Sequence, residues 1–142
     1  ESMIFPGTYQ LVGVDHAVFF VEGLDEIDVE TYGPLLRNHE RFESYGGANI
    51  NFAEAQGKTI RLRTYERGVE AETLACGTGA VATAIAHAKA LKKTGRNRWK
   101  VIPSGGDELL VRFYVGADKV TDIQLGGPAV QVCEVNLHVD LI

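Results

Sequence analysis

The sequence has few of the residues that mark a cross-linked, metal-bound or membrane-spanning protein. It contains two cysteines in 142 residues, and neither belongs to a CxxC pair or a Cys/His zinc spacing. We therefore expect reduced thiols and no metal site, since His39 and His138 also lack partners at metal-ligand spacing. No apolar run is long enough to cross a bilayer, and the first ten residues do not resemble a signal peptide. These absences predict a soluble, cytoplasmic protein that does not bind a membrane.

The sequence also lacks an excess of basic residues. Its formal net charge of −5 opposes attraction to nucleic acid or to an anionic membrane, because both depend on a basic surface. One basic run, from Lys89 to Lys100, includes Trp99 and has the composition of a nucleic-acid-binding surface. Such a run is more often the solvated end of a helix and its turn, and the acidic remainder of the chain supports that interpretation. Small molecules or proteins are the expected partners.

The length and the 45% hydrophobic content are enough for one globular domain over residues 1–142. Alternating or apolar stretches predict strands. The first stretch should be buried, with a break at Gly13, and the second should form a hairpin with its turn at Gln56-Gly57. The predicted strand regions are 8–22, 48–67, 98–104, 107–115, 119–127 and 128–142. A short helix is predicted behind Asp28 as N-cap, although Gly33 and Pro34 are unfavourable within it.

The helix predicted from Gly77 to Lys93 has almost no polar face, so it should be buried. Lys92 and Lys93 suit its last turn, and Gly95 suits the C-cap. Together these elements predict a sheet-dominated domain wrapped around one apolar helix.

Cys76 stands directly before this helix, in the stretch CGTGA. The first turn of a helix leaves backbone N–H groups unpaired and carries a partial positive charge, so it favours anions. Gly77 and Gly79 would let a carboxylate approach the backbone closely. The same field is expected to lower the pKa of the Cys76 thiol. A thiolate beside a held carboxylate suits removal of a proton from the adjacent carbon, whereas the alternative is a small residue at a tight helix entry.

A longer stretch around Cys76, YERGVEAETLACGTGA, resembles the second active-site segment of diaminopimelate epimerase. That enzyme interconverts the L,L and meso forms of diaminopimelate without a cofactor. The resemblance extends through DHAVFFVEGLDEIDVETYGPLLRNHERF and ANINFAEA to GGPAVQVCE, which covers nearly the whole chain. It implies an α+β fold, in which an antiparallel-rich sheet curls around the central helix, and an enzyme of lysine biosynthesis that needs neither pyridoxal phosphate nor metal.

The resemblance also implies roles for individual residues. Cys76 would be one of two cysteines that flank the α-carbon, with the backbone amides of Gly77 and Thr78 holding the α-carboxylate. The distal end of the substrate would meet three further residues: Asn49, Arg67 on the distal carboxylate, and Glu66 on the amino group, where Glu66 also tunes the thiols. His16 matches a histidine that sets the protonation of the cysteine pair.

Four of these residues, Asn49, Glu66, Arg67 and His16, also have an ordinary structural explanation. Glu66 and Arg67 could form a surface ion pair, Asn49 could be a strand-end turn residue, and His16 could be a hydrogen-bonded strand histidine. Without the resemblance, the ordinary explanations would be favoured.

Racemisation by thiols needs one thiol on each face of the α-carbon, and this chain offers one candidate. In QVCEVNLHVDL, the positions 131, 133, 135, 137, 139 and 141 form a mostly apolar face, so Cys133 is expected to be a core residue rather than a catalytic one. The other cysteine of the family lies in an earlier segment of the type ACGNGARC, which this chain lacks. We therefore expect the chain to correspond to the C-terminal half of the epimerase, to be inactive or nearly so without its N-terminal domain, and to self-associate, for example as a homodimer.

Residues 13–16, GVDH, depart from the Gly-Asn-Pro-His of many relatives. Val14 cannot supply the amide contacts of the asparagine, and Asp15 replaces a proline, so the specificity for the distal end is in question. A related racemase of the proline or histidine type therefore stays open as an alternative. So does a non-catalytic module that binds a small carboxylate or mediates dimerisation.

Overall fold

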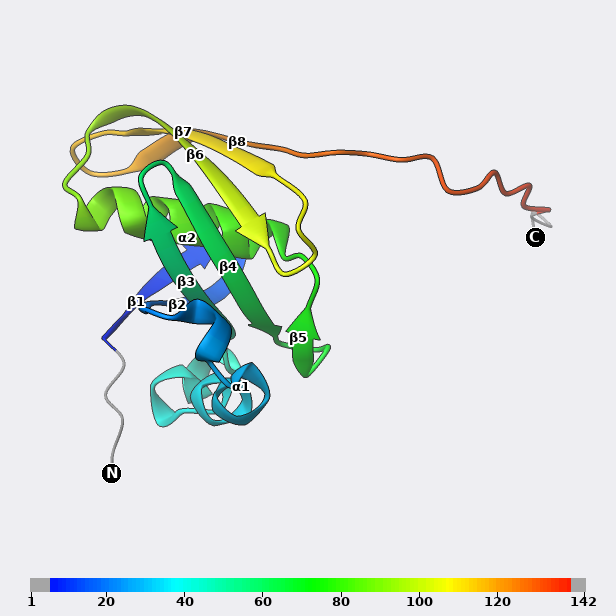
Figure 1. Cartoon of the computed structure of the whole chain (residues 1–142), viewed down its shortest axis with the longest axis horizontal. Helices are drawn as coiled ribbons and strands as arrows, with labels where there is room; N and C mark the ends of the chain where they lie inside the picture. The colour runs from blue at the N-terminus through cyan, green and yellow to red at the C-terminus, as the bar shows by residue number, and fades with distance from the viewer. Residues whose placement is uncertain (1–5, 139–142) are drawn as a thin grey trace.

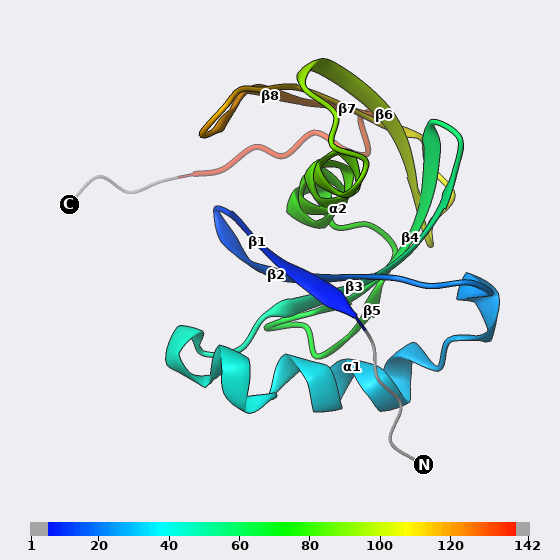
Figure 2. The ribbon, with the colours of Figure 1, turned by 90° about the vertical axis from the view of Figure 1, so that its left-hand side faces the viewer.

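The strands form one mixed sheet that curls around a buried helix. The computed structural model describes residues 6–138, in which eight strands pair in the order β1-β2-β3-β4-β6-β7-β8, with β5 added on β4. The strands are β1 Gly7–Val12, β2 Val14–Phe20, β3 Asn49–Gln56, β4 Thr59–Glu66, β5 Ala71–Thr73, β6 Gly95–Pro103, β7 Leu109–Val115 and β8 Val120–Gly126. Figure 2 shows helix α2, Gly77–Ala90, end-on inside the curl, with β1 and β8 at the two edges of the sheet.

The strand pairs are mostly antiparallel, as the resemblance implies, and the α+β fold is confirmed. Two pairs are parallel, β2 with β3 and β4 with β6. The connection between β2 and β3 contains α1, Val29–Arg37, between two short 3₁₀ helices, η1 Leu24–Glu26 and η2 Glu40–Tyr45. The connection between β4 and β6 contains β5 and α2. Parallel neighbours need such long crossovers, so the sequence order strand-helix-strand fixes these two pairings.

The sheet buries both of its faces over β2, β3 and β4, because α2 covers one face and α1 covers the other (Figure 2). On the α2 side, Ile60 and Leu62 pack with Ala84 and Ile85 of the helix. On the α1 side, residues of β3 and β4 that point to the opposite face pack with Val29 and Leu24. They include Ile50, Phe52 and Tyr65. The period of two in a strand thus separates two cores on opposite faces.

The two predicted turns lie where the sequence indicates. Gly13, with φ of 72°, connects β1 to β2, and Gly57, with φ of 63°, begins the turn from β3 to β4. The prediction of a buried first stretch holds for β2 alone, because β1 is an edge strand whose Tyr9 and Leu11 are exposed.

Helix α1 forms in spite of its glycine and proline. The Asp28 carboxylate caps it by accepting a hydrogen bond from Thr31 N at 3.1 Å. At Gly33 the helix approaches the sheet so closely that a Cβ would lie 2.4 Å from Cγ of Tyr65. Gly33 is therefore needed for this packing, which outweighs its low helix propensity.

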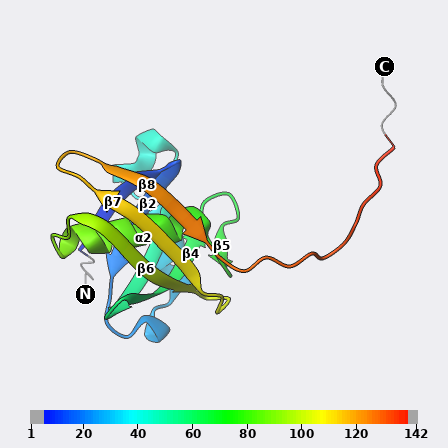
Figure 3. The same ribbon diagram turned by 90° about the horizontal axis from the view of Figure 1, so that it is seen from above.

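Helix α2 is buried along most of its length, as predicted, and Figure 3 shows it beneath the strands β6, β7 and β8. Its predicted end was wrong. The helix stops at Ala90 with Leu91 as C-cap. Lys92, rather than the predicted Gly95, follows the helix end with a positive φ of 53°. Gly95 instead begins β6, where its φ of 73° turns the chain into the strand.

The segment 127–138 follows β8 and runs away from the body of the protein (Figure 1). It contains no strand, and its Val130 and Val132 are 83% and 90% exposed. The predicted strand 128–142 is thus wrong over the described residues, and positions 139 and 141 lie outside them. Cys133 is exposed rather than part of a core, because an alternating pattern becomes a strand only where a neighbouring strand pairs with it.

None of the helices in residues 6–138 has the length and apolar character needed to span a membrane. Within the same residues, no three His, Cys, Asp or Glu side chains gather in a way that could hold a metal ion.

Candidate active site

Cys76 is the N-cap residue of α2. Its backbone is extended, with φ −130° and ψ 107°, and its Sγ accepts a hydrogen bond from Gly79 N at 3.3 Å. The side chain of Cys76 is 7% exposed, while its neighbour Thr78 is exposed. The N–H groups of Gly77 and Thr78 belong to the first turn of the helix, where no preceding helical carbonyl can accept from them. The thiol therefore lies just below the surface, beside the positive end of the helix.

Gly79, the second glycine of the CGTGA stretch, is required for steric reasons. A Cβ on Gly79 would lie 2.6 Å from Oδ1 of Asn51 and 3.1 Å from Sγ of Cys76. The first turn of α2 thus rests directly on β3, and this contact brings the sulfur against the polar residues of the sheet.

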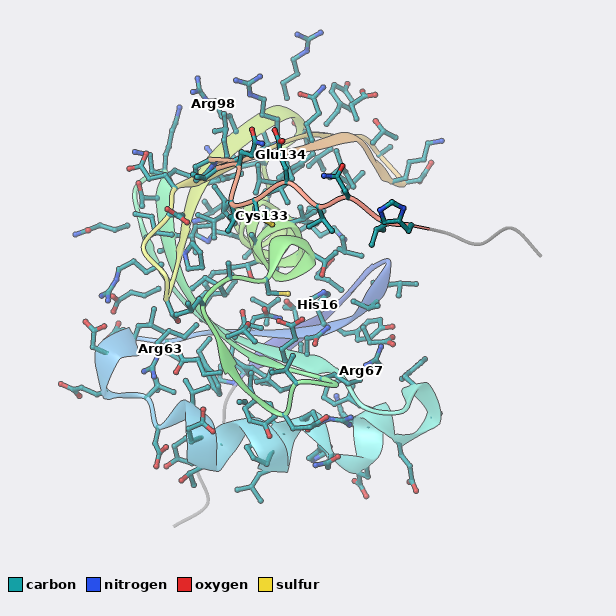
Figure 4. All side chains as sticks on the ribbon, turned by 90° about the vertical axis from the view of Figure 1, so that its right-hand side faces the viewer. His16, Arg63, Arg67, Arg98, Cys133 and Glu134 are labelled. Atoms are coloured by element: carbon teal, nitrogen blue, oxygen red, sulfur yellow. The ribbon has the colours of Figure 1, made fainter. Side chains whose placement is uncertain are left out.

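His16 comes from β2 and faces α2. It is fully buried, and its Nε2 lies 3.0 Å from Oγ1 of Thr78, which in turn lies 3.7 Å from Sγ of Cys76. The other ring nitrogen, Nδ1, lies 3.1 Å from Nδ2 of Asn51. Figure 4 shows His16 between α2 and the β1–β2 hairpin. The structure therefore brings together His16, Thr78 and Cys76, as the resemblance implies.

Burial shifts the pKa values of His16 and Cys76 in the directions that favour their uncharged forms. It lowers the pKa of His16 to about 4, so the ring is neutral near pH 7. It also raises the pKa of the Cys76 thiol, against hydrogen bonds from Gly79 and Thr78 that lower it, while the nearby charge of Glu66 raises it further. The expected lowering of the pKa of Cys76 by the helix was therefore wrong in sign, because desolvation outweighs the donors at the helix start.

Asn49 and Arg67 lie next to each other, at the start of β3 and directly after the end of β4. Oδ1 of Asn49 accepts from the backbone N of Arg67 at 2.8 Å, and Asn49 is the neighbour of His16 in the parallel pair β2–β3. The Nη1 atom of Arg67 donates to the carbonyls of Tyr45 and Gly47 at 3.0 and 2.6 Å. In Figure 4, Arg67 lies on the η2 side of the sheet.

Arg67 is paired with Asp15, the residue that departs from the family pattern. Nη1 of Arg67 lies 3.3 Å from Oδ2 of Asp15, and the Tyr9 hydroxyl donates to Oδ1 at 2.6 Å. The hydrogen bond to Asp15 raises the pKa of Tyr9 to about 12. The alternative of a Glu66–Arg67 surface pair is thus wrong, since Glu66 instead accepts from the Thr73 hydroxyl at 2.9 Å.

Two hollows of ≈ 1000 Å³ and ≈ 540 Å³ lie in the described part of the chain, and neither is lined by Cys76, His16 or Thr78. The larger hollow lies at the outer face of β6 to β8 and includes Arg96, Arg98 and Arg112, where Figure 4 shows Arg98 pointing outward. The basic run therefore belongs to a solvated sheet face.

The sequence is similar to known proteins over most of its length. The family model described as Diaminopimelate epimerase matches residues 8–129. The chain belongs to the diaminopimelate epimerase family. Curated members include the diaminopimelate epimerases of Hydrogenobaculum sp., which is 42% identical over 94% of this chain, and of Aquifex aeolicus, which is 37% identical over 96%. The chain covers 47% of each of these two relatives, so it spans about half the length of the epimerases it matches.

A solved structure agrees with the fold of this family member. A Pseudomonas aeruginosa protein described as a predicted epimerase superposes with a TM-score of 0.58 at 16% identity, over 78% of this chain and 36% of its own. At that identity the likeness concerns the fold alone.

Sequence reasoning missed two residues that lie beside the candidate site. Asn51 lies beneath the first turn of α2 and contacts His16, and Thr64 donates to Oδ1 of Asn51 at 3.0 Å. The alternation along β3 and β4 was a sufficient signal, since a period of two places Asn51 and Thr64 on the face that α2 covers.

Proposed function

We propose that this chain is the C-terminal domain of a diaminopimelate epimerase, which interconverts the L,L and meso isomers in the cytoplasm as a step of lysine biosynthesis. The observation that carries the proposal is the position of Cys76, whose sulfur lies at the N-terminus of a buried helix within reach of the Thr78 hydroxyl, which also contacts His16. The family membership supports the same reaction.

The reaction consists of two proton transfers at one carbon. A thiolate takes the α-proton, the electron pair of the C–H bond stays on the carbon and its carboxylate, and a thiol on the opposite face delivers a new proton to the carbon. A raised pKa keeps Cys76 protonated near neutral pH. Cys76 is thus the proton donor in one direction, and its thiolate, formed by that donation, is the base in the other.

The charge that develops on the α-carboxylate is the costly part of this reaction. The amides of Gly77 and Thr78, at the start of α2, are the groups proposed to hold that carboxylate. The neutral His16 adds no positive charge there, so the helix end supplies the stabilisation.

The second thiol is proposed to lie on an N-terminal domain outside this chain. The relatives are about twice as long, which leaves room for a further domain that would carry this thiol. Cys133 is exposed on the segment that leaves the body of the protein, which does not suit a base facing Cys76.

A second candidate is a racemase for an amino acid without a distal carboxylate. It is favoured by the pair between Arg67 and Asp15, because the negative Asp15 lies where the family's distal carboxylate would be bound. In that case the substrate would carry a neutral or positively charged end.

The experiment is α-proton exchange in deuterated water by the longer protein that contains this chain. Diaminopimelate would be compared with lysine, which lacks the distal carboxylate, and with proline and histidine. We expect rapid exchange with diaminopimelate only. Faster exchange with one of the other amino acids would favour the second candidate, and no exchange with any of them would favour a non-catalytic carboxylate-binding or dimerisation module.

A further inference from the structure

A chain of hydrogen bonds runs under the first turn of α2 from the sheet to the cysteine. It starts at the Thr64 hydroxyl in β4, passes through Asn51 in β3 and His16 in β2, and reaches Thr78 and Cys76 at the helix start. Asn51 is adjacent to Thr64 in the antiparallel pair of β3 and β4 and to Val18 in the parallel pair of β2 and β3. Side chains from three strands thus meet at Asn51, which is fully buried.

The orientation of the Asn51 amide is fixed by its neighbours. Its Nδ2 lies 3.1 Å from the carbonyl oxygen of Ala17 and 3.4 Å from that of Asn49, and both oxygens can only accept. Its Oδ1 accepts from the Thr64 hydroxyl at 3.0 Å. A flipped amide would place an oxygen against these two carbonyls, so Nδ2 is the atom that faces His16.

The direction of the remaining bonds follows from that orientation. Nδ2 of Asn51 donates to Nδ1 of His16 over 3.1 Å, so Nδ1 carries no proton. A neutral ring then carries its proton on Nε2, which donates to Oγ1 of Thr78 over 3.0 Å. With its oxygen accepting from His16, Thr78 has its own hydrogen to donate, and Sγ of Cys76 lies 3.7 Å away.

We propose that Asn51 is a positioning residue for the cysteine, which fixes the tautomer of His16 and so directs the Thr78 hydroxyl hydrogen at the Cys76 sulfur. The sulfur then receives two donors, the Thr78 hydroxyl and Gly79 N. Both stabilise the thiolate against its desolvation. With the other tautomer, Nε2 would accept from Thr78, and the hydroxyl would be turned away from the sulfur.

This inference rests on the proposed function in one respect: the ionisation of Cys76 matters because Cys76 is proposed to move a proton. Its test therefore uses this 142-residue chain and needs no turnover. Cys133→Ser removes the exposed thiol, so that alkylation by iodoacetamide, followed by mass spectrometry across pH, reports Cys76 alone. Nitrogen-15 NMR of the imidazole reports which nitrogen of His16 carries the proton.

The two informative variants are Asn51→Leu and Thr64→Val. Thr64→Val removes one buried hydrogen bond of the cluster, the one to Oδ1 of Asn51. Asn51→Leu removes that bond together with the donor to His16 and the contacts with the carbonyls of Ala17 and Asn49. We expect His16 to be the Nε2–H tautomer in the parent chain and in Thr64→Val, and to be a mixture in Asn51→Leu. Alkylation of Cys76 below its pKa should be about tenfold slower in Asn51→Leu, the effect of one hydrogen bond to a charged group, and within twofold of the parent in Thr64→Val.

Two results would overturn the proposal. One is a His16 protonated on Nδ1 in the parent chain, which decides the question even if Asn51→Leu does not fold. The other is an equal slowing of alkylation in the two variants, which would make Asn51 a residue of general structural importance only. Neither result depends on whether the longer protein epimerises diaminopimelate.

Discussion

The two cysteines of this chain have the same side chain and opposite surroundings. Cys76 is buried at the start of a buried helix, where Gly79 N and the Thr78 hydroxyl approach its sulfur. Cys133 is exposed in the segment that leaves the sheet after β8. Both stand in stretches rich in small and apolar residues, so local composition does not separate them. The neighbours brought by the fold, above all His16 and Asn51 from other strands, separate a candidate catalytic thiol from an ordinary one.

Among the changes expected around Cys76, the largest is in the pH dependence of the stability of the fold. The buried His16 has its pKa lowered from 6.5 to about 4, so the unfolded chain binds a proton in this window that the folded chain does not. The free energy of unfolding should therefore fall as the pH falls from 6.5 to 4, by about 3 kcal/mol for this one group.

The measurement is urea unfolding at several pH values for the parent and for His16→Gln. The variant should lose stability less steeply between pH 6.5 and 4, whatever its stability at pH 7. Parallel curves for the two proteins would mean that His16 is not buried as a neutral ring.

The contact between the helix start and β3 should give the next effect. Gly79→Ala places a Cβ against Oδ1 of Asn51 and Sγ of Cys76, so it should cost about 1–3 kcal/mol of stability as an overpacking change. Gly77→Ala is the matched control, because its Cβ meets only the flexible end of Leu125, at 3.0 Å.

Thermal or denaturant unfolding of the two glycine variants checks this prediction. The Gly77 variant should stay within about 1 kcal/mol of the parent. If the Gly79 variant were equally stable, α2 would not rest on Asn51 as closely as the contact requires.

The reactivity of the two thiols should give the smallest effect, and it compares them directly. Burial raises the pKa of Cys76, so less of it is thiolate at a given pH below that value than of an exposed thiol. In the folded chain at pH 8, iodoacetamide should alkylate Cys133 at least about tenfold faster than Cys76, because the reagent reaches the exposed sulfur freely and less of the buried thiol is thiolate. In urea the two rates should converge; equal rates in the folded chain would contradict the burial of Cys76.

Periodicity in the sequence was sufficient to predict β2, β3, β4 and α2, because each has a partner on the face that its apolar residues define. It failed for the segment 128–138, whose alternation has no neighbouring strand among the described residues. It also gave no reason for a glycine inside α1, because Gly33 is needed for close packing against the Tyr65 ring, which belongs to a strand more than thirty residues later.

The site was predictable where its residues are adjacent in sequence. Cys76 and Gly77 share one helix start, and that position alone indicated a thiol beside an anion site, whereas the role of Thr78 came from the resemblance. The contact between His16 and Thr78 joins residues 62 positions apart and depends on strand order, so it was not predicted; the resemblance indicated only that His16 acts on the cysteines. The sign of the pKa shift of Cys76 failed because burial is set by the packing of α2 against the sheet.

The most direct test of the account is the rate at which the longer protein interconverts the two stereoisomers of its substrate, measured for Cys76→Ala and for Cys133→Ala. The account predicts a loss of at least roughly a thousandfold for the first, since it removes a general acid and base, and a change within about twofold for the second. Retained interconversion in Cys76→Ala, or an equal loss in Cys133→Ala, would contradict the assignment of Cys76 as the proton-transferring group.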